Sequence, residues 1–140
     1  MGTNPLTELR TFGQSIWLDN IRRDLILSGG LKDLIDDDRI RGVTSNPTIF
    51  EKAIAGSDDY DEQLMQLAAE GKNEEQILEE LSIRDIQMAA DVFKPVYDES
   101  DEEDGYISLE VSPLLADQEE ETVQAALDLF ERVNRPNIMI

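Results

Sequence analysis

The stretch Ile40-Arg-Gly-Val-Thr-Ser-Asn-Pro-Thr48 decides the fold. It starts as an apolar strand, reaches a polar residue at Asn46 and continues into Pro47. Proline suits the first turn of a helix, where its missing N–H would have no partner anyway. A strand that passes directly into a helix is the repeating unit of α/β proteins. We therefore predict a strand over 40–46 and a helix from Asn46 to about Ala55.

Three other stretches repeat the strand pattern, and two of them also finish on a polar residue. They are Ser15-Ile-Trp-Leu-Asp19, Tyr106-Ile-Ser-Leu-Glu110 and Asn137-Ile-Met-Ile140. Helical patterns separate the four strands, which favours a parallel sheet. A complete TIM barrel needs about 250 residues, whereas this chain has 140. The predicted fold class is α/β: a half-barrel of about four strand–helix units from a parallel (β/α) barrel of TIM type, forming one domain over residues 1–140.

Helix-capping signals divide the remaining sequence. Asn4-Pro5 predicts a short helix closed by Gly13, and Gly29-Gly30 predicts a bend between two short helices over 21–35. An extra helical insertion is predicted between the second and third strands, with separate helix starts at Ser57, Asn73 and Ser82 and a kink at Pro95.

The last helix is predicted to begin at Asp117 and to have one buried face. Apolar residues recur there at helical spacing, which indicates a stripe that packs on the sheet. The residues of this stripe are Val123, Ala126, Leu127, Phe130 and Val133.

Composition excludes several classes of function. Twelve Lys and Arg against thirty-two Asp and Glu give a net charge of −20, which would repel nucleic acid and anionic membranes. The sequence has no Cys and no His, so we expect no disulfide, no thiol or imidazole catalysis and no ordinary zinc site. We also expect no other metal site and no cofactor. No apolar run reaches the roughly 20 residues of a membrane helix, and the stretch 1–5 does not resemble a signal peptide. We expect a soluble cytoplasmic protein.

The polar strand ends are predicted to lie on one face of the sheet. Side chains alternate along a strand, so Asp19 shares its face with Trp17 and Ser15. By the same alternation Thr44 lies with Asn46, and Ser108 lies with Glu110. A polar inward row indicates a lined cavity, because a purely structural barrel interior favours branched apolar residues.

Each polar end also has a structural explanation. Asp19 could cap the helix that follows it, and Asn46 is expected to be a helix N-cap whatever else it does. Glu110 could pair with a basic residue elsewhere in the chain, because an inward carboxylate is costly without a partner. The acidic runs at 98–104 and 119–121 are expected to serve solubility and the helix dipole.

In order and spacing these segments resemble transaldolases. The resemblance rests on the strand ending at Asp19, on Gly42-Val-Thr-Ser-Asn-Pro-Thr48, on Ile107-Ser-Leu-Glu-Val111 and on Asn137-Ile-Met-Ile140. It implies a barrel enzyme that moves a dihydroxyacetone unit from a ketose phosphate, such as sedoheptulose 7-phosphate, to an aldose phosphate through a lysine Schiff base.

The resemblance also implies roles for individual residues. Asp19 would be the acid–base group during carbon–carbon cleavage, and Glu110 would move protons through a water as the Schiff base forms and hydrolyses. Thr44, Asn46 and Ser108 would orient the substrate and this water. Two carboxylates are needed because each chemical step requires a proton shuttle.

The sequence departs from transaldolases at the nucleophile. In that family the reactive lysine directly follows the apolar run of strand four, and here the sequence ends with that run at Ile140. The four lysines, Lys32, Lys52, Lys72 and Lys94, all lie in predicted helices or turns. We therefore expect sugar-phosphate substrates for the full-length enzyme and no activity for this chain alone.

Three alternatives remain open. The chain could be an assembly module that pairs through its exposed half-barrel edges with a second copy or a complementary chain. It could belong to an aldolase of the same superfamily, which splits ketoses without transferring the fragment. It could also be an acidic binding protein unrelated to barrels.

Overall fold

Four short parallel strands form the centre of the computed structural model, which describes residues 4–140. They are β1 (Trp17–Asp19), β2 (Gly42–Thr44), β3 (Tyr106–Ser108) and β4 (Ile138–Met139), in the spatial order β1-β2-β3-β4. The predicted α/β class and parallel sheet are confirmed, each strand being shorter than expected, and the sheet does not close into a barrel. The expectation that no signal peptide is present depends partly on Met1–Thr3, which lie outside the described residues.

The register of the sheet confirms the predicted alternation. Trp17 lies opposite Gly42, and Asp19 lies opposite Thr44. Gly42 in turn faces Tyr106, and Ser108 faces Met139. These residues share the inner face of the half-barrel. The opposite face carries Val43, Ile107 and Ile138, all buried.

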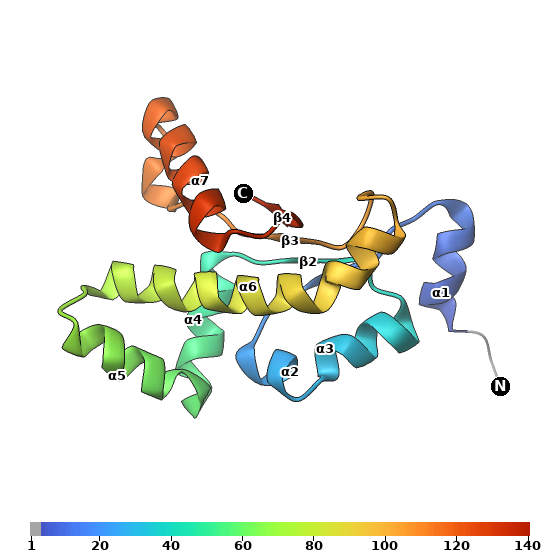
Figure 1. The fold of residues 1–140 in the computed structure, drawn as a ribbon, viewed down its shortest axis with the longest axis horizontal. Coiled ribbons are helices and arrows are strands. Elements are labelled where there is room, and N and C mark those ends of the chain that lie inside the picture. The colour runs from blue at the N-terminus through green and yellow to red at the C-terminus, as the bar shows by residue number, and fades with distance from the viewer. Residues whose placement is uncertain (1–3) are drawn as a thin grey trace.

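Helix α6 (Glu74–Glu99) covers this apolar face of the sheet. It runs along the sheet next to β2 and β3, and its C-terminal turns, which include Pro95, tilt away from the main axis (Figure 1). Ile86, Ala89, Ala90 and Phe93 of α6 are completely buried in one core with the sheet residues. The separate helix predicted from Ser82 is wrong, because Ser82 lies inside α6 and its hydroxyl donates to the Leu78 carbonyl at 2.8 Å.

The other helices begin and end close to the predicted signals. Asn4 caps α1, Asn46 caps α4, Ser57 caps η3 and Asn73 caps α6. Gly29, with a φ of 85°, separates α2 from α3 as predicted. The elements are α1 (Pro5–Leu9), η1 (Arg10–Phe12), α2 (Arg23–Leu27), α3 (Gly30–Asp33), the π-helical η2 (Leu34–Asp38), α4 (Pro47–Ala55), η3 (Asp58–Tyr60), α5 (Asp61–Ala69), η4 (Pro113–Leu115) and α7 (Glu119–Val133).

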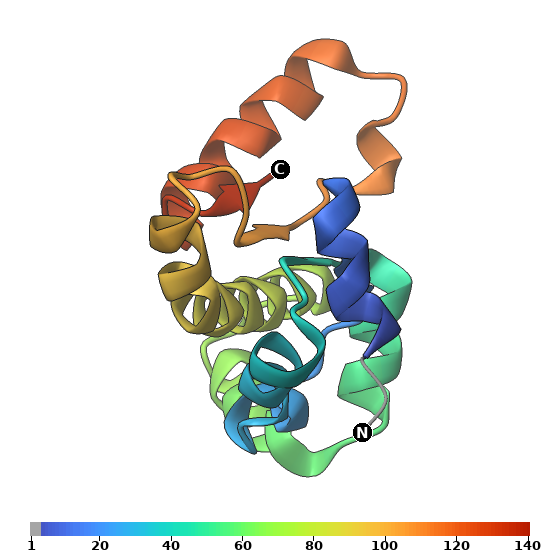
Figure 2. The ribbon, with the colours of Figure 1, turned by 90° about the vertical axis from the view of Figure 1, so that its right-hand side faces the viewer.

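Helix α7 is less buried than its sequence predicts. Leu129 and Val133 are buried, but Val123, Leu127 and Phe130 are 55%, 60% and 49% exposed. Its N-cap is Gln118 rather than Asp117. Figure 2 shows α7 projecting on one side of the molecule while helices α2 to α6 gather on the other. The predicted apolar stripe is therefore only half covered by residues 4–140.

A buried ionic network joins the helical insertion to α2. Arg23 Nε donates to Asp85 Oδ1 at 2.8 Å, and the Tyr60 hydroxyl donates to Asp85 Oδ2 at 2.7 Å. The guanidinium also lies over the Tyr60 ring, 4.3 Å from its centroid. Burial raises the pKa of Asp85, whereas the bonds from Tyr60 and Arg23 oppose that rise. Asp85, predicted as part of a capping signal, instead holds α2, η3 and α6 together.

Candidate active site

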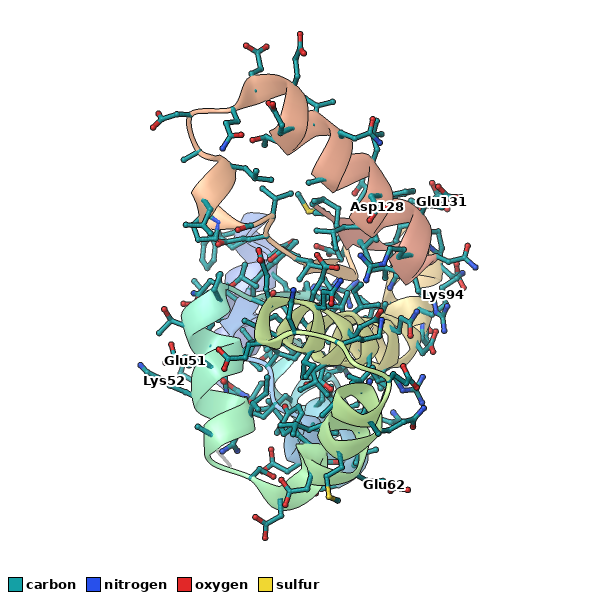
Figure 3. The ribbon with its side chains drawn as sticks, turned by 90° about the vertical axis from the view of Figure 1, so that its left-hand side faces the viewer. Glu51, Lys52, Glu62, Lys94, Asp128 and Glu131 are labelled. Carbon is teal, nitrogen blue, oxygen red and sulfur yellow. The ribbon has the colours of Figure 1, made fainter. Side chains whose placement is uncertain are left out.

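The polar residues predicted at the strand ends lie at the same edge of the parallel sheet. Figure 3 views the molecule from the side on which β2 ends and α4 begins. The charged side chains labelled there, among them Glu51 and Lys52 of α4 and Glu131 of α7, project from the outer surfaces of the helices. These labelled charges therefore do not belong to the inner row of the sheet.

Asp19 and Thr44 form the centre of the site. They lie opposite each other on neighbouring strands, and Thr44 Oγ1 donates to Asp19 Oδ1 at 2.7 Å. The helix after β1 has Arg22 at its N-cap position and no side-chain cap. The interpretation of Asp19 as a helix cap is therefore wrong. Its exposed carboxylate is held by a neighbouring strand instead.

Asn46 both ends the β2 segment and starts α4. Its side-chain oxygen accepts a hydrogen bond from the Ile49 N–H at 2.9 Å, which confirms the predicted N-cap. This bond uses one of the two acceptor positions of the oxygen, and within residues 4–140 the amide nitrogen makes no hydrogen bond, so its N–H groups are available to a ligand. The cap therefore fixes the direction of the amide.

Glu110 follows the end of β3 and is exposed. Within residues 4–140 its carboxylate makes no hydrogen bond or ion pair, so the alternative of a structural partner finds no support in this part of the chain. Glu110 and Asn46 line one cavity of about 130 Å³, which the apolar side chains of Pro47, Phe50 and Leu109 also border. Glu110 and Asn46 thus border the same cavity, whereas Asp19 does not.

Ser108 makes a pair of contacts that the sequence did not indicate. Its hydroxyl oxygen accepts from the Ser45 backbone N–H at 3.1 Å, and its carbonyl oxygen accepts from the Ser45 hydroxyl at 2.6 Å. Ser45 was not among the predicted site residues, and it is 3% exposed. A serine between two inward polar residues at a strand end was the only signal that could have found it.

None of the four lysines lies at the ends of the strands. Lys32 pairs with Asp36 in the α3–η2 segment, Lys72 pairs with Glu80, and Lys94 pairs with Asp98 within α6. Lys52 projects outward from α4 (Figure 3). The positions predicted for these lysines are confirmed.

The acidic turn after α6 has a structural contact beyond solubility. Asp104 accepts from Arg41 Nε at 3.0 Å and from the Ser15 hydroxyl at 2.6 Å, where the strands begin. The run Glu119–Glu121 occupies the first turn of α7, as expected for the helix dipole.

Over residues 4–140, no helix combines the length and apolar character needed to cross a membrane. In the same range, no three acidic side chains are grouped so that they could hold a metal ion.

Comparison with known proteins identifies the class that this fold and site define. Residues 16–140 match the Transaldolase/Fructose-6-phosphate aldolase family, and the chain belongs to that family. The alternative of an unrelated acidic binding protein is therefore wrong.

The curated relatives are named transaldolases. The chain is 50% identical over 141 residues to the transaldolase of Saccharopolyspora erythraea, covering all of this chain and 38% of the relative. It is 46% identical over 140 residues to transaldolase 2 of Nostoc punctiforme, again covering all of this chain and 37% of the relative. For the transaldolase of Thermobifida fusca the identity is 47% over 137 residues, with 98% and 37% covered. The chain thus spans little more than a third of the length of these relatives.

Proposed function

We propose that the protein to which this chain belongs is a transaldolase of the pentose phosphate pathway in the cytoplasm. It transfers a dihydroxyacetone unit between sugar phosphates through a lysine Schiff base, and this 140-residue domain is the N-terminal half of its barrel. The observation that carries the proposal is the bond between Thr44 and Asp19 at the ends of neighbouring parallel strands. Active sites of parallel barrels lie at this edge.

The proposed roles follow the position of each side chain. Asp19, exposed and held by Thr44, takes the proton of the substrate hydroxyl as the carbon–carbon bond breaks. Glu110, which has no partner within residues 4–140, moves protons through a water during formation and hydrolysis of the Schiff base. Asn46 offers its amide group, and Thr44 and Ser108 offer hydroxyls that orient the substrate and this water.

The proposal includes inactivity of this chain alone. A Schiff base needs an amine beside Asp19, and the lysines of residues 4–140 all lie away from the strand ends. Borohydride reduction in the presence of a ketose phosphate tests this directly. We expect no covalent adduct on the 140-residue chain and a trapped adduct on the whole enzyme. An adduct on the 140-residue chain would contradict the proposal.

An aldolase of the same superfamily is the nearest alternative, since the family name covers both activities. The names of the relatives favour transfer. Cleavage of a ketose phosphate by the whole enzyme should need an aldose phosphate acceptor. Release of free dihydroxyacetone at the same rate without an acceptor would favour the aldolase.

A second candidate function is self-association of this chain. Val123, Leu127 and Phe130 expose one apolar face of α7, and β1 and β4 are open sheet edges. A second copy could cover both. A net charge of −20 opposes this association, so added salt should strengthen it.

Sedimentation velocity tests the second candidate. We expect the fraction of dimer to increase with salt concentration, and Phe130→Glu should abolish the dimer. Met65→Glu is the matched control, because Met65 is also an exposed apolar residue, on α5. A monomer under all salt conditions would contradict self-association.

A further inference from the structure

Ser45 and Ser108 form a two-bond clamp just beyond the last paired residues of β2 and β3, which are Val43 and Ile107. Ser45 donates twice, from its backbone N–H to Ser108 Oγ at 3.1 Å and from its hydroxyl to the Ser108 carbonyl at 2.6 Å. Both bonds join the same two residues. The clamp therefore fixes the side chain and the backbone of Ser108 together.

Burial protects one side of the clamp. Ser45 is 3% exposed, whereas Ser108 is half-buried on the inner face. Water competes little for a buried hydroxyl that is bonded to a carbonyl. The bond from the Ser45 hydroxyl to the Ser108 carbonyl is therefore retained while the inner face is solvated. The buried serine acts as the rigid partner, and Ser108 is the group that it holds.

The clamp also sets the hydrogen-bonding role of Ser108. A serine hydroxyl has one proton and two acceptor positions. One acceptor position of Ser108 Oγ is occupied by the Ser45 N–H, and its proton is not used in any hydrogen bond within residues 4–140. The hydroxyl of Ser108 is thus held as a donor beside Met139 on the inner face.

We infer that Ser45 is a positioning residue of the active site, which acts through Ser108 to direct a hydroxyl donor at an oxygen of the substrate or of the reacting water. This inference rests on the proposed transaldolase function. Ser45 also lies between Thr44 and Asn46, so the same clamp fixes the segment that carries both.

The first test measures the clamp itself in the 140-residue chain. Amide hydrogen exchange of Ser45 should be slow in the unaltered chain and at least about ten-fold faster in Ser108→Ala, which removes the acceptor. Equal exchange rates in the two chains would overturn the inference. This measurement does not depend on any enzymatic activity.

The second test measures catalysis in the whole enzyme. Ser45→Ala should lower kcat about ten-fold and leave KM within about two-fold, because a misplaced donor affects the reacting geometry more than binding. Ser45→Thr keeps the hydroxyl and should retain most of kcat. Ser45→Val has the shape of threonine without the hydroxyl and should lower kcat as Ser45→Ala does.

Ser100→Ala is the matched control. Ser100 also donates to a backbone carbonyl, that of Tyr97 at 3.1 Å, and accepts from the Asp104 N–H, but it lies where the strands begin. It should lower thermal stability without lowering kcat. If Ser45→Ala lowers kcat no more than Ser100→Ala, or raises KM alone, the positioning role is wrong. If the unaltered whole enzyme shows no transfer activity, the proposed function fails instead.

Discussion

Gly42 lies directly beneath the indole ring of Trp17. A Cβ atom added to Gly42 would stand 2.5 to 2.8 Å from three atoms of that ring, closer than nonbonded atoms approach. The two residues are opposite each other on β2 and β1, one level below Asp19 and Thr44. Glycine at this position therefore lets the indole cross the neighbouring strand and fill the layer under Asp19 and Thr44.

Gly42→Ala should destabilise the 140-residue chain by about 1–3 kcal/mol, because overpacking forces the ring or the strand to move. Trp17 is the only tryptophan in the sequence, so its fluorescence reports the displacement without interference. Urea denaturation followed by this emission measures both effects. The double variant Trp17→Leu with Gly42→Ala, followed by circular dichroism, should lose less stability than the sum of the single changes. If the losses of stability in the two single variants add up to that of the double variant, the close approach of Trp17 is not what makes alanine unfavourable at Gly42.

Tyr60→Phe should destabilise the chain by about 1–3 kcal/mol, because the buried Asp85 carboxylate loses a hydrogen-bond donor. The Arg23 N–H, which donates to the same hydroxyl at 3.0 Å, also loses its partner. Chemical denaturation of the two chains measures the difference. Leu64→Ala, on the same helical insertion and 36% exposed, provides a control for a side chain outside the network.

The pH dependence of the Tyr60→Phe effect has a defined sign. Burial raises the pKa of Asp85 above its ordinary value of 3.8, and the Tyr60 hydroxyl opposes that rise. The variant should raise the pKa of Asp85 further. A raised pKa in the folded state costs stability above that pKa and not below the unfolded value, so the loss should be larger at neutral than at acidic pH. Carboxyl NMR titration follows Asp85 directly, and a pKa that falls in the variant would contradict this account.

Thr44→Val should lower kcat of the whole enzyme about ten-fold, because the Asp19 carboxylate loses the donor that orients it. Asp19→Asn should cost about 10²–10⁴-fold, the range expected for losing an acid–base group. Thr44→Ser keeps the hydroxyl and should stay close to the unaltered enzyme. Steady-state kinetics with a ketose phosphate and an aldose phosphate measures all three. A Thr44→Ser variant as impaired as Thr44→Val would contradict the account, because Thr44→Ser keeps the hydroxyl that donates to Asp19.

Asn46→Ala should cost the 140-residue chain about 1 kcal/mol through loss of the α4 cap. Asn46→Asp keeps the capping oxygen and should cost much less, as urea denaturation can measure. In the whole enzyme both variants lack the amide group and should both lose activity. An Asn46→Asp variant with full activity would show that capping is the whole contribution of Asn46.

The sequence by itself determined the features that depend on neighbouring residues. Strand alternation placed Asp19, Thr44 and Ser108 on one face, and the caps Asn46 and Asn73 marked helix starts, because these signals act within a few residues. The alternation of strands and helices along the chain predicted the parallel sheet. The functional roles assigned through the transaldolase resemblance remain predictions.

Only the tertiary structure decided which residues far apart in the chain meet. It paired Asp19 with Thr44 instead of with the following helix, joined Ser45 to Ser108, and buried Asp85 against Arg23. It also left the outer face of α7 uncovered, although its spacing indicated burial. Periodicity shows that a helix has an apolar face, but the surface that covers this face is set by packing between distant segments, which no local pattern specifies.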